Sequence, residues 1–537
     1  MLNEGLKELP DSVSELQEMV MDIRHQMVEM EANITVFEKE NDLLRSQNDL
    51  IREELRLLRL KMFTRISERY QDEAENLQRL LFEDLSECET DKEEKQEELI
   101  INEHKRKKPG RKPIPEDLPR VEKVHDIAEE DKQCACGNKK SRIGEETCEK
   151  MQIEPARFWV EKHIRPKYAC KACEGVESMD KTVSIAPMPP AMIPKSISTP
   201  SLLTHIFISK FCDAIPFYRQ EKQFKRYGIA IPRSTMCNWA FKVANRLKPL
   251  IEMLRLTILS GPLINVDETT VQVLAEPGRK PQAKSYAWVF RGGIPGMPGL
   301  YYQYAPSRSG KVAKKNLKDY EGYVQTDGYA GYNFLDVKPG IIHCGCWAHV
   351  RRKFNDVAKA AGGKYGGKGN ANHALSLIRD LYLIEREAKN KGFDEEKTYQ
   401  LRQERSKPIV EELGTWLKEN VLKIPPQSLL GKAFNYTLSQ WPRLIKYLDN
   451  GLVRMDNNLI ENAIRPFVIG RKNWLFSVTP KGAEASASFY SLIETAKANG
   501  LEPSKYLRYL FEKFPYAKTS EDVFNLLPMN ILEIDLK

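Results

Sequence analysis

A seven-residue repeat of apolar side chains occupies the N-terminal part of the chain. Apolar residues recur at one heptad position from Val13 to Met62, and again three residues later from Leu16 to Leu58. A strict repeat over about seven heptads is typical of a coiled coil, because it keeps one apolar seam against a partner helix.

Asn41 and Asn48 interrupt this seam at the first of the two heptad positions. A buried Asn amide is best satisfied by its twin in a parallel dimer, at some cost in stability. We therefore predict an N-terminal α-helical coiled coil over residues 1–70 that forms a homodimer or a higher homo-oligomer. The alternative is a long helix that packs on its own chain.

Charge is distributed unevenly along the 537 residues, which are enough for several domains. Residues 1–104 contain 13 basic and 28 acidic side chains, whereas the remainder contain 70 basic and 47 acidic ones. A strongly basic body favours a polyanionic partner, most simply nucleic acid. The chain shows no signal-peptide core and no apolar run of about 18 residues. We expect a cytoplasmic or nucleoid-associated protein without a membrane partner.

Residues 71–120 are predicted to be a linker that is first acidic and then basic. KRKKPGRKP at 105–113 holds six basic residues and no acidic one. Its prolines favour an extended strip that could lie in a narrow A·T-rich minor groove. A solvated basic linker is the alternative. The candidate DNA-binding residues in this strip are Arg106, Lys108, Arg111 and Lys112.

Two close pairs of cysteines lie in residues 121–180, namely Cys134/Cys136 and Cys170/Cys173. Two loops joined by strand-like runs can bring four thiolates onto a tetrahedral, structural zinc ion. The first pair is one residue tighter than the usual spacing, so Cys148 or His163 could replace a ligand. Four buried free thiols are the alternative. The prediction is a small zinc-binding β module.

A Pro-rich stretch at 181–200 reads as an extended linker, and residues 195–255 then predict three helices. The second spans Pro216 to Tyr227, Gly228 ends it, and a third helix follows Pro232 with Ser234 as the expected N-cap. This order is typical of a helix-turn-helix, in which Arg219 and Arg233 are candidate DNA contacts. An ordinary α-hairpin is the alternative.

Residues 260–480 change to an alternation of strands and helices. The order β-β-β-α-β-α predicts a mixed α/β sheet flanked by helices. An α-helical insertion is expected at about 370–450. A short helix from Asn457 should stop at Pro466, with a strand-like RKNWLF after it. Residues 481–537 should be helical, starting with a helix at 482–498 that Gly500 ends.

Acidic residues in and after the predicted strands are candidate metal ligands. Asp267 interrupts an apolar strand, and Asp327 ends another one before a Gly turn. If these strands are neighbours, two carboxylates meet at one edge of the sheet, and a third could complete a site for two Mg²⁺ ions. Glu268 competes with Asp267. The candidates for the third carboxylate are Asp449, Asp456, Glu461 and Glu494. Ordinary turn aspartates are the alternative.

Several sequence runs carry a resemblance that extends over nearly the whole chain. They include PGRKPIPEDLPR, the paired cysteines, IPFYRQEKQFKRYGIAIPRSTMCNW, NVDETTVQVL, VQTDGYAGY, CWAHVRRKF, NNLIENAIRPFVIGRKNWLF and SLIETAKANGLEPSKYL. With these runs in this order, the chain resembles transposases of the insertion sequence 66 family.

The resemblance implies a ribonuclease H-like catalytic core with Asp267, Asp327 and Glu461 as its three carboxylates. They would hold two Mg²⁺ or Mn²⁺ ions in each active site. The family pattern usually has Arg after the glutamate, whereas this chain has Asn462. Arg465, four residues after Glu461, could orient the carboxylate or hold a phosphate, or simply form an ion pair.

Basic residues near these carboxylates are further candidate DNA contacts. They are His349, Arg351, Arg352, Arg465, Arg471 and Lys472. His349 could touch the scissile phosphate or a catalytic carboxylate, or could be an ordinary core or surface histidine. His343, Cys344, Cys346 and His349 could in principle bind a metal, although packing also explains this run.

The resemblance implies a bacterial transposase that binds double-stranded DNA at the terminal repeats of its own element. It would hydrolyse the strand ends and transfer the 3′-hydroxyls to target DNA, and small accessory proteins of the same element are expected partners. The main alternative is a retired transposase that acts as a DNA-binding repressor or architectural protein. A structure-selective nuclease on the same fold is a second alternative.

Overall fold

The computed structural model describes residues 12–63, 157–169, 183–361 and 369–536. The chain forms two compact units, residues 91–189 and the remainder. In the smaller unit, β1 (Lys167–Ala169) pairs antiparallel with β2 (Val183–Ile185). The predicted zinc ligands, Cys148 and the basic strip at 105–113 lie outside the described residues, whereas His163 is exposed and lies 3.8 Å from a Glu161 oxygen.

The heptad region forms one long helix, α1 (Val13–Phe63), of 51 residues. Side chains of the predicted seam are exposed on it, including Met27, Ile34 and Phe37. A helix of this kind leaves its apolar stripe available to another helix. None of the described helices is both long enough and apolar enough to cross a membrane.

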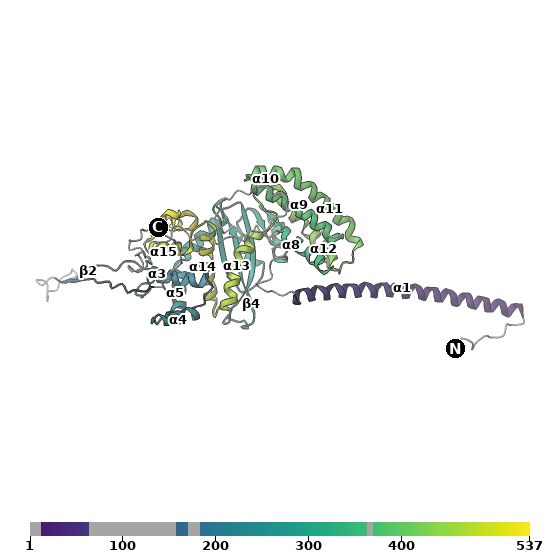
Figure 1. Ribbon diagram of the computed structural model, residues 1–537, viewed down its shortest axis with the longest axis horizontal. Helices are drawn as coiled ribbons and strands as arrows, with labels where there is room; N and C mark the ends of the chain where they lie inside the picture. The colour runs from purple at the N-terminus through teal and green to yellow at the C-terminus, as the bar shows by residue number, and fades with distance from the viewer. Residues whose placement is uncertain (1–11, 64–156, 170–182, 362–368, 537) are drawn as a thin grey trace, which may run out of the picture. The chain divides into compact units, whose positions relative to one another are not determined.

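A five-stranded mixed sheet forms the centre of the larger unit (Figure 1). Its strands are β3 (Leu263–Gln272), β4 (Lys284–Gly292), β5 (Gly299–Ala305), β6 (Gly322–Gln325) and β7 (Ile341–Cys344). Their order in the sheet is β5-β4-β3-β6-β7. The first three strands pair antiparallel, and β6 and β7 add in parallel beside β3. The predicted mixed sheet flanked by helices is confirmed, but the chain has one strand more than the predicted β-β-β-α-β-α order, since β7 follows β6 before the next α-helix.

Alternate residues of the central strand β3 face two different cores. Ile264 and Val266 pack with Trp288 and Phe290 on one face of the sheet. Val271 belongs to the other core, which is covered by helices. Because side chains alternate along a strand, Asp267 lies on the same face as Val271, and Glu268 lies on the opposite face.

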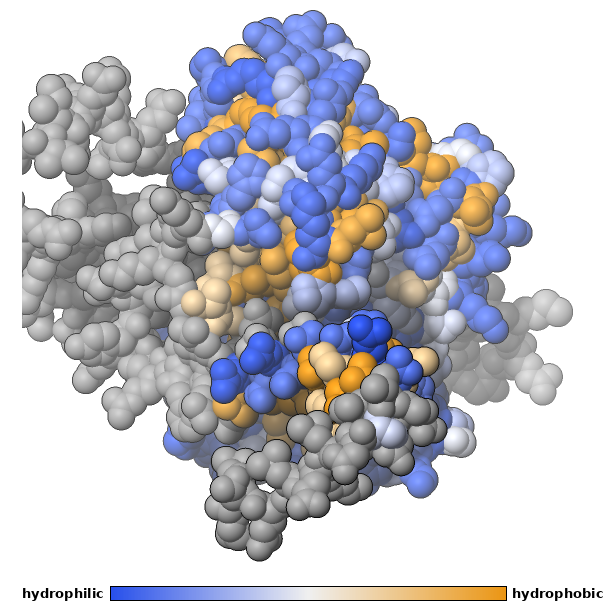
Figure 2. Space-filling view, turned by 90° about the vertical axis from the view of Figure 1, so that its right-hand side faces the viewer, coloured by the Kyte–Doolittle hydropathy of each residue, from blue (hydrophilic) through white to orange (hydrophobic). Residues whose placement is uncertain are grey.

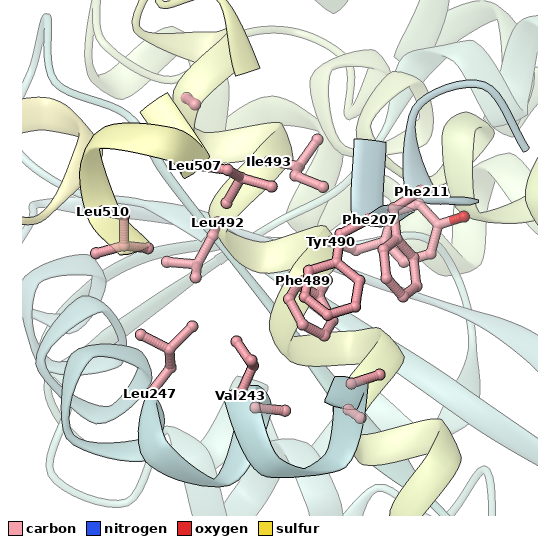
Figure 3. Close-up of a cluster of buried hydrophobic side chains, with 14 of the residues drawn as sticks. Phe207, Phe211, Val243, Leu247, Phe489, Tyr490, Leu492, Ile493, Leu507 and Leu510 are labelled. Atoms are coloured by element: carbon pink, nitrogen blue, oxygen red, sulfur yellow. The ribbon is translucent and has the colours of Figure 1, made fainter. Parts of the chain in front are cut away.

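Helix α14 (Pro480–Ala498) covers the second face and anchors the largest core (Figure 3). Phe489 of α14 stacks on Phe211, the last residue of α3 (Pro200–Phe211), and Tyr490 meets the same ring edge-on. Two hydroxyl groups of α14 also accept hydrogen bonds from backbone N–H groups at the edge of β5. The Tyr302 N–H donates to Ser491 Oγ at 2.8 Å, and the Leu300 N–H donates to Thr495 Oγ1 at 2.9 Å. The helix thus closes an edge that would otherwise expose unpaired donors.

Four helices precede the sheet and share that core. They are α3 (Pro200–Phe211), α4 (Phe217–Arg226), α5 (Arg233–Arg246) and α6 (Lys248–Leu259). Gly228 adopts φ +74° between α4 and α5, as a helix-ending glycine does. The expected N-cap at Ser234 is wrong. The N-cap lies two residues earlier, at Pro232, and the Arg233 N–H donates to the Glu221 carboxylate of α4 at 3.2 Å.

The region after β7 is helical, as predicted for the insertion. It contains α8 (Trp347–Ala360), α9 (Asn370–Asn390), α10 (Glu395–Leu401), a π-helix η5 (Arg402–Ser406), α11 (Lys407–Asn420) and α12 (Leu429–Leu444). These helices surround their own core, built on Trp347, Phe354 and Phe434. Figure 2 shows one face of the molecule, on which hydrophilic residues predominate and hydrophobic residues form smaller patches.

The expected helix stop at Pro466 and the expected strand RKNWLF are both wrong. Helix α13 (Asn458–Trp474) runs through Pro466 and ends only before Leu475, which adopts φ +65°. A proline inside a helix costs one hydrogen bond. Burial of Ile460, Ile464 and Phe467 on either side of it holds the helix against the sheet and outweighs this cost.

The remaining elements are short or C-terminal. They are α7 (Lys311–Asn316), η4 (Ala330–Val337), η6 (Val421–Lys423), η7 (Ile445–Asp449), α15 (Pro503–Lys513), η8 (Phe514–Tyr516), α16 (Ser520–Asn525), η9 (Pro528–Asn530) and η10 (Glu533–Leu536).

Candidate active site

The parallel pairing of β3 with β6 brings the two predicted aspartates to one level of the sheet. Asn265 lies opposite Gln325 in this pairing. Asp267 and Asp327 each follow two residues later, so both come beyond the paired segment on the same side. β6 ends at Gln325, which leaves Asp327 at the open end of its strand, where its Oδ1 accepts the Tyr329 N–H at 2.9 Å.

Asp267 lies in a strongly negative environment. Burial raises the pKa of its carboxyl well above the usual range, and the charges of Glu268, Asp327 and Glu461 raise it further. Its Oδ1 accepts only the nearby Glu268 N–H, at 2.7 Å. A divalent cation would relieve this repulsion, and oxygen ligands of this kind suit Mg²⁺ or Mn²⁺. The residues present therefore fit a hard divalent cation.

Glu268, the competitor of Asp267, is held on the other face of the sheet. Glu268 Oε1 accepts a hydrogen bond from Arg308 Nε at 2.5 Å, and Glu268 Oε2 accepts one from the Tyr332 hydroxyl. The side chain is almost fully buried in this arrangement. It is thus paired on the face of the sheet opposite Asp267.

Glu461 lies in the first turn of α13 and meets two residues of α8. Its Oε2 lies 3.4 Å from Arg352 Nη2, and its Oε1 lies 3.8 Å from His349 Nδ1. The structure therefore brings His349 and Arg352 to the third predicted carboxylate. Arg465 is exposed on α13, and the ion pairs described for Glu461 are with α8, so the i,i+4 ion pair, one of the alternatives for Arg465, is not formed.

The other candidates for the third carboxylate have local partners. Asp449 pairs with Lys446 at 3.1 Å, and Glu494 pairs with Lys497 at 2.9 Å inside the α14 core. Asp456 is partly buried, and its Oδ2 accepts a hydrogen bond from the Tyr382 hydroxyl at 3.0 Å. Of these, Asp456 alone lies near Glu461, whose charge helps to raise the pKa of the Asp456 carboxyl after burial has raised it.

A buried network of three amides lies beneath the carboxylates and was not foreseen from the sequence. Asn265 Nδ2 donates to Gln325 Oε1 at 3.0 Å and to Asn457 Oδ1 at 2.8 Å. Asn457 Nδ2 in turn donates to the Val266 carbonyl at 3.3 Å. The network ties β3, β6 and the start of α13 together, and so fixes the distance between Asp267, Asp327 and Glu461.

The predicted basic residues take several positions. Arg219 and Arg233 are exposed on α4 and α5, and Lys472 is exposed near the end of α13. Arg351 stacks over the Tyr382 ring, with its guanidinium carbon 5.3 Å from the ring centre. Arg471 differs from these, because its guanidinium bonds to Thr269 and Thr270 of β3 and so fastens α13 to the sheet.

His343 takes part in a buried chain beside Asp327 and not in a metal site. Its Nε2 lies 2.8 Å from Thr326 Oγ1, and its Nδ1 lies 2.7 Å from an oxygen of Asp336. Arg443 holds the same Asp336 carboxylate. Burial lowers the pKa of His343 to about 4, against the opposite effect of Asp336, while Arg443 lowers it further.

We expect His343 to make the folded state less stable as the pH falls from about 6.5 to about 4. In this range the unfolded chain binds a proton that the buried ring does not accept, so the stability present above pH 6.5 is lost. Between pH 7 and pH 5 the loss should be about 2 kcal/mol. Urea unfolding of the wild type and of His343→Gln would measure it, and an equal loss in both proteins would contradict the prediction.

Four segments of the chain match known protein families or domains. Residues 195–485 match the transposase IS66 family, and residues 491–529 match its C-terminal element. Residues 131–174 match the zinc-finger binding domain of transposase IS66, and residues 50–122 match a homeodomain described as transposase C of IS166. The matches follow the chain in the order of the segments described above.

Relatives from Sinorhizobium fredii (strain NBRC 101917 / NGR234) cover most of the chain. The uncharacterized protein y4jD is 35% identical over 432 residues, which are 78% of this chain and 81% of the relative. The uncharacterized protein y4qI is 30% identical over 439 residues, which are 79% of this chain and 78% of the relative.

Proposed function

Because the chain belongs to the IS66 family of transposases, we propose that it is a DNA transposase that acts on the terminal repeats of its own insertion sequence. It would hydrolyse the strand at each end and transfer the freed 3′-hydroxyl to target DNA. A bacterial, nucleoid-associated location is part of this proposal.

One observation carries the proposal: the carboxylates of Asp267, Asp327 and Glu461, from distant parts of the chain, influence one another beside the end of β6. We assign the binding of two Mg²⁺ or Mn²⁺ ions to Asp267, Asp327 and Glu461; bound there, the ions would activate the attacking hydroxyl and stabilise the leaving oxygen. The strand order, with three antiparallel strands and two parallel ones beside the first, supports a ribonuclease H-like core.

Residues of α8 would bind the DNA strand beside these carboxylates. Arg352 is about half exposed and lies 3.4 Å from Glu461, so it can contact a phosphate without leaving the site. Positioning of the reacting groups by such contacts would contribute much of the rate. His349, behind it, is partly buried and would help to set the position of Glu461.

Recognition of the ends would fall to the parts of the chain that precede the sheet. Exposed basic residues of α4 and α5 support a helix-turn-helix contact with the DNA duplex. The match to a zinc-finger domain supports a structural zinc ion, for which we propose Cys134, Cys136, Cys170 and Cys173 as ligands. The basic strip with Arg106, Lys108, Arg111 and Lys112 would add contacts to the minor groove.

Two transposon ends must be held together, and α1 offers a means of doing so. We propose that it pairs with α1 of a second copy as a parallel coiled coil. Its exposed seam, in which Ile34 is about half exposed, supports this proposal. Small accessory proteins of the same element would join the assembly.

Ile34→Asp should convert the dimer into a monomer, because it places a charge inside the apolar seam of both helices. Thr35→Asp introduces the same charge on the next residue, outside the seam, and should remain dimeric. Sedimentation velocity of the two full-length variants distinguishes these results. A dimer in both cases would contradict pairing through this seam.

Cleavage of a labelled duplex that carries the element's own terminal repeats tests the proposed function. We expect nicking at the repeat boundary that requires Mg²⁺ or Mn²⁺ and is lost in Asp327→Asn and Glu461→Gln. Binding of the duplex, followed by a gel-shift assay, should persist in both variants. If Glu461→Gln still cleaves the duplex, Asp456 would be the next candidate for the third metal-binding carboxylate.

The two alternatives predict different results in the same assay. A retired transposase would bind the terminal repeats without cutting them, even with the accessory proteins and metal present. A structure-selective nuclease would cut without regard to the repeat sequence. Cleavage confined to the repeat boundary would exclude both.

A further inference from the structure

A second group of potential metal ligands includes Glu461, through Oε1, the oxygen that does not contact Arg352. Cys346 occupies the cap position of α8, His349 follows in its first turn, and Glu461 reaches them from α13. One ligand atom of each residue lies within 4.8 Å of the other two. This group brings together sulfur, nitrogen and oxygen, unlike the oxygen ligands at Asp267 and Asp327.

Two of these atoms are buried without a hydrogen-bond partner. They are His349 Nδ1 and Glu461 Oε1, which lie 3.8 Å apart. This distance is too long for a hydrogen bond, and buried polar atoms are normally paired. A cation between the two atoms would satisfy both.

The third potential ligand, Cys346, has the burial and the hydrogen bond that are typical of a thiolate bound to a metal. Cys346 is buried, and its Sγ accepts the Asn457 N–H at 3.2 Å. Hydrogen bonds of this kind orient the ligands of a metal site. Burial raises the pKa of the Cys346 thiol above its usual value, so a bound metal would have to displace its proton.

We propose that Cys346, His349 and Glu461 bind a zinc ion, or another thiophilic divalent cation, and that this binding inhibits the enzyme. A set of one sulfur, one nitrogen and one carboxylate oxygen suits tetrahedral zinc with one open position. Zinc at this site takes Glu461 Oε1 and so withdraws the carboxylate from Asp267 and Asp327. The inhibitory part rests on the proposed function, whereas the binding part does not.

Cobalt titration of the full-length protein tests the binding part. Co²⁺ in a tetrahedral site with a thiolate ligand gives visible absorption bands that the protein itself lacks. With its structural zinc already bound, the wild type should bind one further Co²⁺ per chain that gives these bands, apart from any Co²⁺ held by oxygen ligands alone. Cys346→Ser and His349→Gln should weaken this binding by at least about tenfold. Cys344→Ser, which removes a buried thiol two residues away, should take up Co²⁺ as the wild type does.

The variants separate loss of a ligand from loss of the fold. If Cys346→Ser unfolds, as judged by thermal melting, His349→Gln decides the result, since that side chain is partly exposed. Absence of cobalt uptake in the wild type, or uptake that persists in both ligand variants, would overturn the site.

The rate of DNA cleavage in Mg²⁺ tests whether zinc inhibits the enzyme. One equivalent of zinc is added to each protein, and the rate is compared with the rate of the same protein without zinc. Zinc should reduce wild-type cleavage at least about tenfold, and much less in Cys346→Ser. Equal inhibition in both proteins would overturn this part. Cobalt uptake without any cleavage, under all conditions, would count against the proposed function and leave the metal site standing.

Discussion

Replacement of Asp267 by Asn is expected to abolish DNA cleavage while making the metal-free protein more stable. Loss of a carboxylate that holds a catalytic cation removes several kcal/mol of transition-state stabilisation, which corresponds to about 10³-fold or more in rate. Asn keeps the size of the side chain and can still accept the Glu268 N–H, which lies 2.7 Å from Asp267 Oδ1. The loss of activity would therefore not come from a disturbed fold.

The gain in stability follows from the sign of the pKa shift at Asp267. Burial, and then the charges of Glu268, Asp327 and Glu461, raise this pKa, so the folded state holds the proton more tightly than the unfolded state does. The favourable contribution of the protonated carboxyl is complete below the unfolded pKa, near 3.8, and is lost as the pH rises through the folded pKa. At neutral pH an uncharged Asn avoids this loss.

Thermal melting in a metal chelator at pH 5 and pH 8 measures the effect, and the gain of Asp267→Asn over the wild type should be larger at pH 8. Added Mg²⁺ should raise the melting temperature of the wild type and not that of the variant. Asp449→Asn is the matched control, since Asp449 is exposed and pairs with Lys446. A variant that melts below the wild type in chelator would contradict the proposed charge cluster.

The sequence was sufficient to predict the arrangement of the main elements, because their signals are local. The heptad repeat predicts α1, and the strand-like runs after residue 260 predict β3 and its neighbours. Gly228 and Gly500 both adopt positive φ at the helix ends where they were expected. These features depend on residues close together in the chain, and periodicity detects them.

The sequence alone could not distinguish Asp267 from Glu268 as a candidate metal ligand, because the distinction depends on how the strands pair. Asp267 and Glu268 are equally acidic and neighbouring, so spacing alone leaves them equivalent. Because Asn265 pairs with Gln325, Asp267 is the residue that lies level with Asp327. Glu268 instead accepts hydrogen bonds from Arg308 and Tyr332 on the opposite face of the sheet. The resemblance to a family had indicated Asp267, and the geometry supplies the physical reason.

Other features depended on contacts too distant in the sequence to predict. The bond from Asn265 to Asn457 joins residues 192 positions apart. Pro466 was expected to end a helix, since the local rule disfavours proline there. The apolar residues of α13 pack against a sheet that forms only in the folded chain. This packing outweighs the local preference against proline inside a helix.

Arg402 is the clearest case of a residue whose importance the sequence hides, and its replacement by Leu is expected to cost about 3–5 kcal/mol in the free energy of unfolding. Its side chain is 2% exposed, in the π-helix η5 of the insertion. It forms two hydrogen bonds to the Glu385 carboxylate, at 2.8 and 2.6 Å. Leu would leave that carboxylate in a largely buried position without its partner.

Three backbone carbonyls make the cost larger than that of the ion pair alone. Arg402 Nη1 donates to the carbonyls of Tyr447, Asn450 and Val453 at 2.9, 2.7 and 2.8 Å. These residues lead toward the start of α13, which carries Glu461. Release of this segment should therefore also lower DNA cleavage at temperatures where the variant is still folded.

Arg405→Leu is the matched control, because Arg405 lies three residues further along and pairs with Glu387 while 46% exposed. An exposed pair of this kind contributes at most about 1 kcal/mol. Urea unfolding of the two variants should thus differ by several-fold in the free energy lost. Similar losses would show that burial of Arg402 has little effect on stability.

The double variant Arg402→Leu with Glu385→Leu separates the two contributions. If the unpaired carboxylate caused the whole loss, removing Glu385 would restore the wild-type stability. The Tyr447 and Val453 carbonyls, however, remain buried and lose their donor in both variants, and each unsatisfied buried group costs about 1–3 kcal/mol. Recovery should therefore be partial, which would identify Arg402 chiefly as the donor that holds the segment before α13 in place.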